Sequence, residues 1–266
     1  MRIQHNIPAM NAYRNLSLNN SALNKNLEKL SSGYKINRAG DDAAGLAISE
    51  KMRSQITGLQ TAQKNAKDGI SMVQSAEGAL TEVHDMLNRM VELATQAANG
   101  TYTSDDQGYL NQEFSELKSE IDRIAQKTRF NDQQIFQSNT IVLQVGEKSG
   151  DEISFNVGTL AGLIGASVAV DTATAAKSAI SSINDAIKTV NGTRATLGAT
   201  QNRLEHTINN LGVVTENIQD AESTIRDTDI AEEMMAYTKN NILIQSAQAM
   251  LAQANQVPQG VLQLLQ

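Results

Sequence analysis

The sequence predicts a mainly α-helical protein, a long antiparallel coiled-coil rod with one small β-hairpin and paired N- and C-terminal helices. The chain has 266 residues but only two prolines, Pro8 and Pro258, so nothing between them has to interrupt a helix. Apolar residues recur in heptads in both halves of the chain. Aromatic residues make up only 3%, which suits thin helix–helix seams of small and aliphatic side chains.

The strictest heptad lies in the second half of the chain. One seam position is apolar in seven consecutive repeats: Ile183, Val190, Leu197, Leu204, Leu211, Ile218 and Ile225. Three or four repeats already indicate a coiled coil, so this segment predicts one long helix. The partner position carries the polar residues Arg194, Gln201 and Thr215, and we expect such residues to set the register of the pairing.

The first half carries a matching seam, which consists of Leu59, Ala66, Val73, Leu80, Leu87 and Ala94. We expect a helix from about Ala43 to Ala98 and, with N-caps offered by 104–106, another to about Lys127. Alternating β-rich runs at 140–145 and 152–157 flank a turn-rich loop and predict a hairpin near 140–157. A loose connector over about 158–172 should lead back into helix.

The two ends of the chain carry thinner apolar stripes and opposite charges. Residues 1–40 hold six Lys and Arg and one Glu, whereas 216–266 hold seven Asp and Glu and two Lys and Arg. We therefore expect the two ends to pair with each other. Such thin stripes cannot bury much surface within one chain, so each end should become ordered only by packing against something else.

Composition and motifs argue against several classes of function. Cysteine is absent, which excludes a disulfide framework, a thiolate metal site and a Cys nucleophile. The net charge is −7 with no block of Lys or Arg, so neither nucleic acid nor a membrane surface is expected as a partner. No nucleophile–base pair, metal cluster or phosphate loop appears, and we expect neither an enzyme nor a cofactor.

Two long motifs near the ends resemble a known family. The run LSSGYKINRAGDDAAGLAI occupies 30–48, and ANQVPQGVLQLL occupies 254–265. Both resemble bacterial flagellin, in the order and at the places where that family has them, and the likeness covers nearly the whole chain outside about 137–172. That interval has no room for the variable outer domains of most flagellins, so the chain resembles a short form.

The resemblance implies a structural subunit that polymerises into the extracellular bacterial flagellar filament used for motility. It implies an axial domain of terminal helices, 1–43 and 223–266, and a helical rod domain, 44–222. It also implies secretion through the flagellum's own channel and further partners, namely an export chaperone at the C-terminal helix, the filament cap and hook–filament junction proteins. As the assembly core we predict these apolar anchors: Leu16, Leu23, Leu27, Leu30, Ile244, Leu251, Val261, Leu262 and Leu265.

The segment 88–96 resembles the stretch by which many flagellins engage the innate immune receptor Toll-like receptor 5. The matching residues in this chain are Arg89, Leu93 and Glu113. On the heptad, the buried seam falls on Leu87, Val91 and Ala94, which should leave Arg89 and Leu93 available to a partner. Filament contacts are the alternative use of this face. Two rival functions for the whole chain stay open, a hook–filament junction subunit and a secreted ligand for a host receptor without a role in motility.

Overall fold

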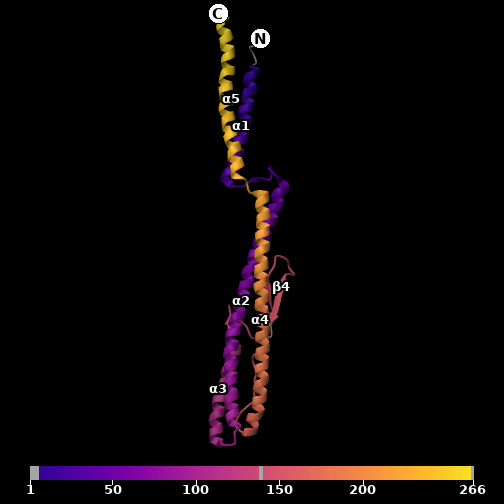
Figure 1. Ribbon diagram of the computed structural model, residues 1–266, viewed down its shortest axis with the longest axis vertical. Helices are drawn as coiled ribbons and strands as arrows, with labels where there is room; N and C mark the ends of the chain where they lie inside the picture. Colours follow the sequence, from indigo (N-terminus) through magenta and orange to yellow (C-terminus); the bar gives the residue numbers. More distant parts are fainter. Residues whose placement is uncertain (1–5, 138–139, 265–266) are drawn as a thin grey trace. The chain divides into compact units, whose positions relative to one another are not determined.

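The structure, a computed structural model, describes residues 6–137 and 140–264, and the stretch 257–264 by its backbone alone. Its described residues form five helices: α1 (Ile7–Ser32), α2 (Ala43–Ala97), α3 (Ser104–Lys127), α4 (Ala173–Arg226) and α5 (Ile230–Leu264). Between α3 and α4 lie the strands β1 (Arg129–Phe130), β2 (Gln133–Gln134), β3 (Thr140–Gln144) and β4 (Glu152–Asn156) (Figure 1). The predicted fold class is confirmed.

Side chains at the helix ends explain where the helices begin and stop. Asn6 caps α1, because its Oδ1 accepts the backbone N–H of Ala9 at 3.2 Å. At the other end of α1, Gly33 adopts the left-handed conformation with φ 75° and donates its N–H to the Lys29 carbonyl at 2.8 Å. A capping box between Thr103 and Asp106 begins α3, so its cap is Thr103, one residue before the predicted run.

The motif at 30–48 encodes the turn from α1 into α2. Asp42 caps α2, since its Oδ1 accepts the N–H groups of Ala44 and Gly45 at 3.1 and 2.9 Å. A Cβ at Gly45 would lie 2.5 Å from Asp42 Oδ2, so glycine is the residue that leaves space for this cap. The motif therefore combines a helix stop at Gly33 with a helix start at Asp42.

The chain divides into two compact units. Unit 1 comprises 1–56 and 216–266, and unit 2 comprises 57–215. Helices α2 and α4 each contribute residues to both units, whereas α1 and α5 belong to unit 1 and α3 and all four strands belong to unit 2.

The core of unit 2 is shared by three helices. Gln63 on α2 donates from Nε2 to the carbonyl of Ile208 on α4 at 3.3 Å. Glu77 Oε1 lies 3.6 Å from Arg194 Nη2. Glu77 comes fourteen residues after Gln63 on α2, whereas Arg194 comes fourteen residues before Ile208 on α4. The two helices therefore run antiparallel, as predicted. Phe114 of α3, 1% exposed, belongs to the same core.

The hairpin β3–β4 pairs antiparallel with Thr140 opposite Asn156, close to the predicted place. A second, shorter hairpin, β1–β2, was not predicted, and it turns through Asn131 and Asp132 with φ values of 49° and 63°. Asparagine and aspartate tolerate this left-handed conformation better than other non-glycine residues, but the pair lacks the Asn-Gly sequence that usually signals such a turn.

The expectation of a loose connector after the hairpin is wrong. Lys118 Nζ on α3 donates to the carbonyls of Gly165 and Ala166 at 2.9 and 2.8 Å, and Asn111 Oδ1 accepts the N–H of Val170 at 3.0 Å. Val170 itself is fully buried. Polar side chains of α3 therefore hold this segment against unit 2, although its own composition resembles that of a linker.

In unit 1, α1 and α5 lie side by side and antiparallel (Figure 1). Asn6, which precedes α1, donates from Nδ2 to the carbonyl of Ala254 at 2.8 Å. Near the other end of α1, Lys29 Nζ lies 3.4 Å from Glu233 Oε2. The predicted pairing of the oppositely charged ends is confirmed.

Candidate functional site

The seam between α1 and α5 is polar near the end of α1 and the beginning of α5. Asn26 is the buried residue of α1 and is 8% exposed, and Glu233 on α5 is 9% exposed. With its amide nitrogen turned toward α5, Asn26 donates to Glu233 Oε1 at 2.9 Å and accepts from Asn240 Nδ2 at 3.0 Å. Together with Lys29, these contacts satisfy and neutralise a carboxylate that would be costly to bury alone.

Large apolar side chains of the same helices face away from this seam. On α5, Met235 and Ile242 are 68% and 59% exposed and, seven residues apart, lie on one face of the helix. Among the side chains of α1 and α5 that the structure describes, the large apolar ones at least 40% exposed are Ile7, Met10, Tyr13, Leu18, Leu27, Ile230, Met234, Met235, Ile242, Leu243 and Met250. A helix pair that buries polar groups and exposes apolar ones has the arrangement of an interaction surface.

The predicted anchors divide into three groups. Leu16, Leu23 and Leu30 are half-buried, as is Leu251, while Ile244 is 9% exposed. Leu27 is 44% exposed. Nothing is described of the side chains of Val261 and Leu262, and Leu265 lies outside the described residues. Most of the described anchors therefore support pairing within one chain, and their role between chains stays a prediction.

The prediction missed Met10, Tyr13 and Leu18 on α1 and Met235, Ile242 and Met250 on α5 as surface residues. A signal was present in the spacing, because Met235 and Ile242, and likewise Leu243 and Met250, are seven residues apart. Leu243 and Met250 directly precede the predicted anchors Ile244 and Leu251, so the two pairs lie on different faces of α5.

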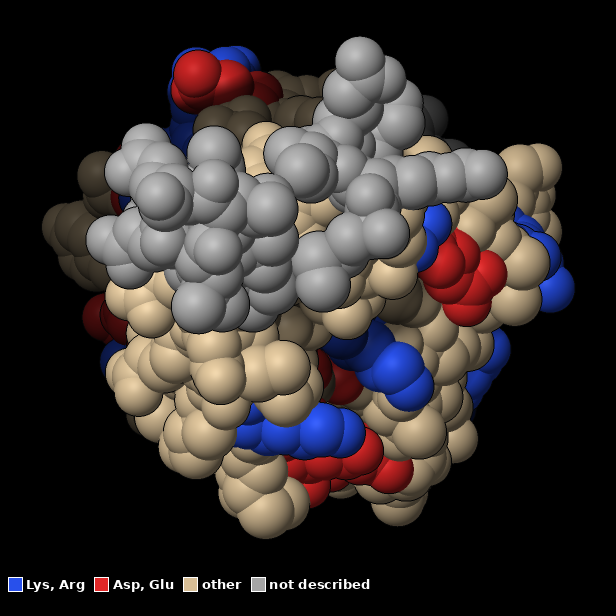
Figure 2. Space-filling view, turned by 90° about the horizontal axis from the view of Figure 1, so that it is seen from above, with Lys and Arg blue, Asp and Glu red and all other residues tan. Residues whose placement is uncertain are grey.

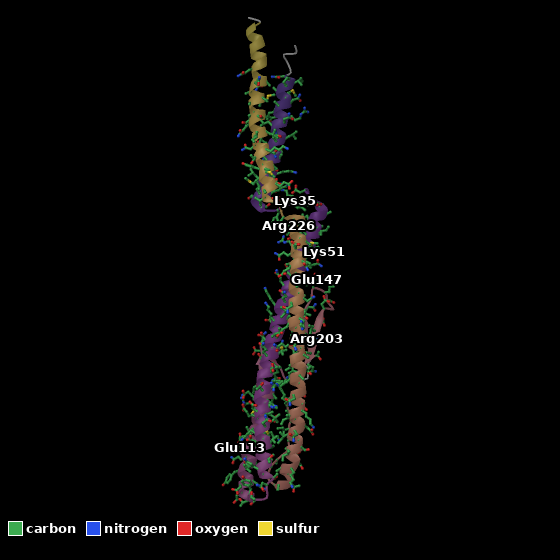
Figure 3. The ribbon with its side chains drawn as sticks, viewed as in Figure 1. Lys35, Lys51, Glu113, Glu147, Arg203 and Arg226 are labelled. Atoms are coloured by element: carbon green, nitrogen blue, oxygen red, sulfur yellow. The ribbon has the colours of Figure 1, made fainter. Side chains whose placement is uncertain are left out.

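Arg226, at the end of α4, joins several segments of unit 1. Its guanidinium lies 4.6 Å from the centre of the Tyr34 ring, and its Nη1 donates to Glu50 Oε1 at 2.8 Å. Its carbonyl accepts the N–H of Lys35 at 2.7 Å (Figure 3). The hydrogen bond from Arg226 is the main cause that lowers the pKa of Glu50. This cluster holds the residues after α1 against the residues between α4 and α5.

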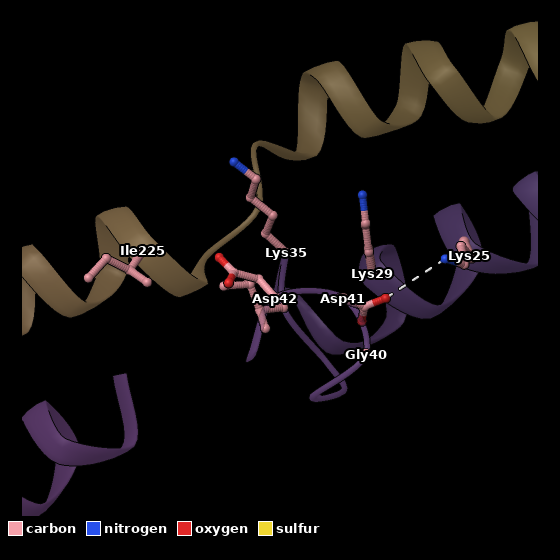
Figure 4. Close-up of a pocket in the computed structure, with 8 residues that line it drawn as sticks. Lys25, Lys29, Lys35, Gly40, Asp41, Asp42 and Ile225 are labelled. Carbon is pink, nitrogen blue, oxygen red and sulfur yellow. Dashed lines mark ion pairs between the residues drawn. The ribbon is translucent and has the colours of Figure 1, made fainter. Parts of the chain in front are cut away.

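A pocket of about 480 Å³ lies beside this cluster (Figure 4). Lys25, Lys29 and Lys35 line it together with Asp41 and Asp42, and Lys25 Nζ lies 3.9 Å from Asp41 Oδ1. Three lysines against two aspartates leave the lining with an excess of one positive charge, and Lys29 also forms an ion pair with Glu233. Figure 2, which looks at the molecule from above, shows mostly uncharged side chains on the described part of that view, with positive and negative groups lying next to each other.

Arg89 and Glu113 come together on the surface of unit 2, although they are 24 residues apart in the chain. Arg89 Nε on α2 donates to Glu113 Oε1 on α3 at 2.9 Å, and Arg89 Nη1 donates to Glu92 Oε2 at 2.9 Å. These hydrogen bonds, first of all the one to Glu113, raise the pKa of Arg89. Both side chains of the Arg89–Glu113 pair are 46% exposed, so they remain accessible to a partner.

The heptad argument that left Leu93 available to a partner is wrong, because Leu93 is fully buried. A heptad describes the contact between two helices, but α2 in unit 2 packs against both α4 and α3. The wider buried stripe includes Met90 and Leu93, while Val91 is only half-buried. The accessible part of the predicted receptor patch therefore comprises Arg89 and Glu113.

No group of three or more His, Cys, Asp and Glu that could hold a metal ion occurs among the described residues. None of the helices, over the part of the chain described, combines the length and apolarity needed to cross a membrane.

Comparison with known proteins matches both halves of the chain. The model of the bacterial flagellin N-terminal helical region matches residues 3–140, and that of the C-terminal helical region matches residues 180–265. Flagellin of Halalkalibacterium halodurans is 55% identical over 271 residues, and the flagellar filament 33 kDa core protein of Treponema phagedenis is 46% identical over 285 residues. Both matches cover all of each chain. The crystal structure of Bacillus cereus flagellin is 34% identical, covers 56% of this chain and 88% of that chain, and has a TM-score of 0.52.

Unit 2 is a helical bundle, and unit 1 contains a helix pair with polar groups in its seam and apolar side chains on its outside. These features are typical of a structural protein that associates through its surface. The chain belongs to the bacterial flagellin family. It is a structural subunit of the extracellular flagellar filament and not an enzyme. Between the two matched regions lie only the β3–β4 hairpin, the connector and the first residues of α4, which is the short form of the family.

Proposed function

We propose that the chain polymerises by burying the outward apolar faces of α1 and α5 against neighbouring copies of itself. The observation that carries this proposal is the burial pattern of the α1–α5 pair, in which the polar residues Asn26 and Glu233 are buried while the apolar residues Met235 and Ile242 are exposed. Burial of apolar surface contributes about 25 cal/mol per Å², and a subunit in a filament gains it on several sides. A head-to-tail contact that does not close on itself generates a helical filament.

The predicted anchors and domains fit into this mechanism as follows. Leu16, Leu23 and Leu30, with Ile244 and Leu251, hold α1 and α5 together so that both outer faces are presented at once. Leu27 adds to the exposed surface, and Val261, Leu262 and Leu265 extend the anchor set toward the end of the chain. The axial domain is then 1–43 with 223–266, and the rod domain is 44–222 with its hairpin near 140–157.

The test removes the apolar character of one face. We expect the double variant Met235→Gln, Ile242→Gln to stay folded but to lose assembly onto preformed filament seeds, followed by electron microscopy. The matched control Met235→Leu, Ile242→Leu keeps the face apolar and should assemble. Deleting 230–266 should abolish filaments altogether. Normal filaments from the Gln variant would show that this face is not buried in the filament, and filaments from the truncated chain would refute the assembly core.

Further partners follow from the same surface. Before export, the apolar faces of α5 need a cover, and we propose that an export chaperone provides it on the C-terminal helix. At the two ends of a filament, subunits lack neighbours, and we propose that the filament cap and the hook–filament junction proteins contact them there. Each should bind the wild-type monomer more tightly than the Met235→Gln, Ile242→Gln variant in a pull-down with purified proteins.

We also propose that the monomer is recognised by Toll-like receptor 5 through Arg89 and Glu113. Support comes from their pairing on an accessible surface, where Arg89 presents hydrogen-bond donors in a fixed orientation. We expect Arg89→Ala and Glu113→Ala to weaken binding to the receptor ectodomain in a surface plasmon resonance measurement. The control is Arg123→Ala, because Arg123 forms a similarly exposed ion pair with Glu120 on α3. Equal affinities of all variants would refute the assignment.

The two rival functions are separated by simple observations. A hook–filament junction subunit would occur in few copies at the filament base, whereas a filament subunit labels the whole length in immunogold electron microscopy. A secreted receptor ligand without a motility role would leave a deletion strain motile. We expect label along the whole filament and loss of motility.

A further inference from the structure

The methionines of the chain are distributed unevenly between its two units. Four of them lie on the terminal helices and are exposed: Met10 at 62%, Met234 at 47%, Met235 at 68% and Met250 at 62%. In the core of unit 2, Met72 is 6% exposed and Met90 is fully buried. Met52 and Met86 are half-buried. Exposed thioethers are thus concentrated on the surface through which the subunit is proposed to assemble.

The amino-acid composition makes these sulfur atoms the groups that a mild oxidant attacks first. The chain has no Cys and no Trp, so Met is its most readily oxidised side chain. A peroxide transfers one oxygen atom to the thioether sulfur, which becomes a sulfoxide, while the peroxide is reduced to water. The product is a polar group that a methionine sulfoxide reductase can convert back.

We propose that Met10, Met234, Met235 and Met250 form an oxidation-sensitive site that controls whether the monomer can assemble. This inference rests on the proposed burial of the outer faces of α1 and α5. A sulfoxide on those faces would have to leave water without gaining a hydrogen-bond donor, and this opposes association. The fold of the monomer is unaffected, because these four side chains contribute little to either core. Once a filament has formed, its contacts shield the same sulfur atoms.

The test compares monomer and filament after treatment with dilute hydrogen peroxide. Mass spectrometry of the monomer should show oxidation at the four exposed methionines first, at Met52 and Met86 later, and at Met72 and Met90 last. The oxidised monomer should keep its helical circular dichroism spectrum. Its critical concentration for seeded assembly should rise by about tenfold or more, the factor expected when each copy buries a poorly solvated polar group. Preformed filaments should be protected at the four positions.

Two variants make the result specific. Replacing Met10, Met234, Met235 and Met250 by Leu keeps the faces apolar, and this variant should assemble equally well with or without peroxide. Met72→Leu, Met90→Leu changes buried sulfur atoms instead and should remain as sensitive as the wild type. The proposal is overturned if the oxidised wild type assembles normally, if the fourfold variant is inhibited equally, or if filaments are oxidised at these sites as fast as monomers. Failure of the untreated protein to assemble would instead refute the proposed function.

Discussion

Units 1 and 2 use similar helices but complete their cores differently. Among the described residues, the buried apolar side chains of unit 1 are Ile36 and Ile244, and all the others belong to unit 2. In unit 2, α3 and the hairpin segments cover the faces that a helix pair leaves open, for instance at Phe114 and Phe155. In unit 1 no third helix of the described chain covers α1 and α5 in this way.

The difference shows that a helix pair is too thin to form a core by itself. Two helices share one narrow seam, whereas a third helix makes each partner bury two stripes. Unit 2 obtains its third helix from its own chain. Unit 1 keeps polar groups such as Glu233 in its seam and many of its large apolar residues outside, and we propose that neighbouring copies supply the missing contacts. On this proposal, unit 2 provides most of the stability of the fold and unit 1 provides the surface for assembly.

The largest expected effect contrasts a buried with an exposed leucine. Leu93→Ala in unit 2 should lower the free energy of unfolding by about 2–5 kcal/mol, because it opens a cavity in a fully packed core. Leu27→Ala in unit 1, where the side chain is 44% exposed, should change it by about 0.5 kcal/mol or less. Urea denaturation of the monomers measures both. Similar losses for the two variants would contradict the contrast between the units.

A second prediction concerns the polar seam. Asn26→Ala removes the amide that bonds Glu233 and Asn240, and should destabilise the α1–α5 pair by about 1–3 kcal/mol. Faster hydrogen exchange of the α1 amides measures this loss, while unit 2 should be unaffected. The control Asn20→Ala alters an exposed asparagine on the same helix and should leave exchange nearly unchanged. If both variants behave alike, the seam does not depend on its buried amide.

Two glycines of α2 give a smaller and opposite pair of effects. A Cβ at Gly69 would collide with Cδ1 of Leu143, the end of a flexible side chain that has to move aside, so Gly69→Ala should cost about 1 kcal/mol or less. At Gly78 nothing lies within 4 Å, so Gly78→Ala should stabilise the helix by up to about 1 kcal/mol. Thermal unfolding followed by circular dichroism separates the two, and a stabilising Gly69→Ala would mean that β3 does not pack closely on α2.

The smallest effect depends on pH. Arg226 holds the pKa of Glu50 below its usual value, so the contribution of this pair is present above the pKa of the unfolded chain and is lost as the pH falls through the lowered value. Glu50→Gln should therefore be slightly less stable than the wild type near pH 7, and the difference should disappear at about pH 2. Because Glu50 is exposed, solvent screening keeps the effect small. A difference that grows on acidification would reverse the assigned sign.

Much of the fold could be predicted because its signals are local or strictly periodic. The heptads located α2 and α4, and the alternating run at 152–157 marked β4. Opposite charges identified the partners α1 and α5. The Arg89–Glu113 pair was suggested by resemblance alone, since no local rule connects residues 24 apart on two helices.

The sequence by itself determined the helices, their antiparallel pairing and the family, because caps, turns, heptads and motifs each act within a few residues of the chain. The predicted heptad seams of α2 and α4 are buried or half-buried, but only the tertiary structure decided which further faces of the helices are covered. Leu93 is buried in the core to which α2, α3 and α4 all contribute, whereas Met235 on the α1–α5 pair is exposed. Periodicity shows that a helix has an apolar face but not how many neighbours it has, and the number of neighbours determines what remains for other molecules to bind.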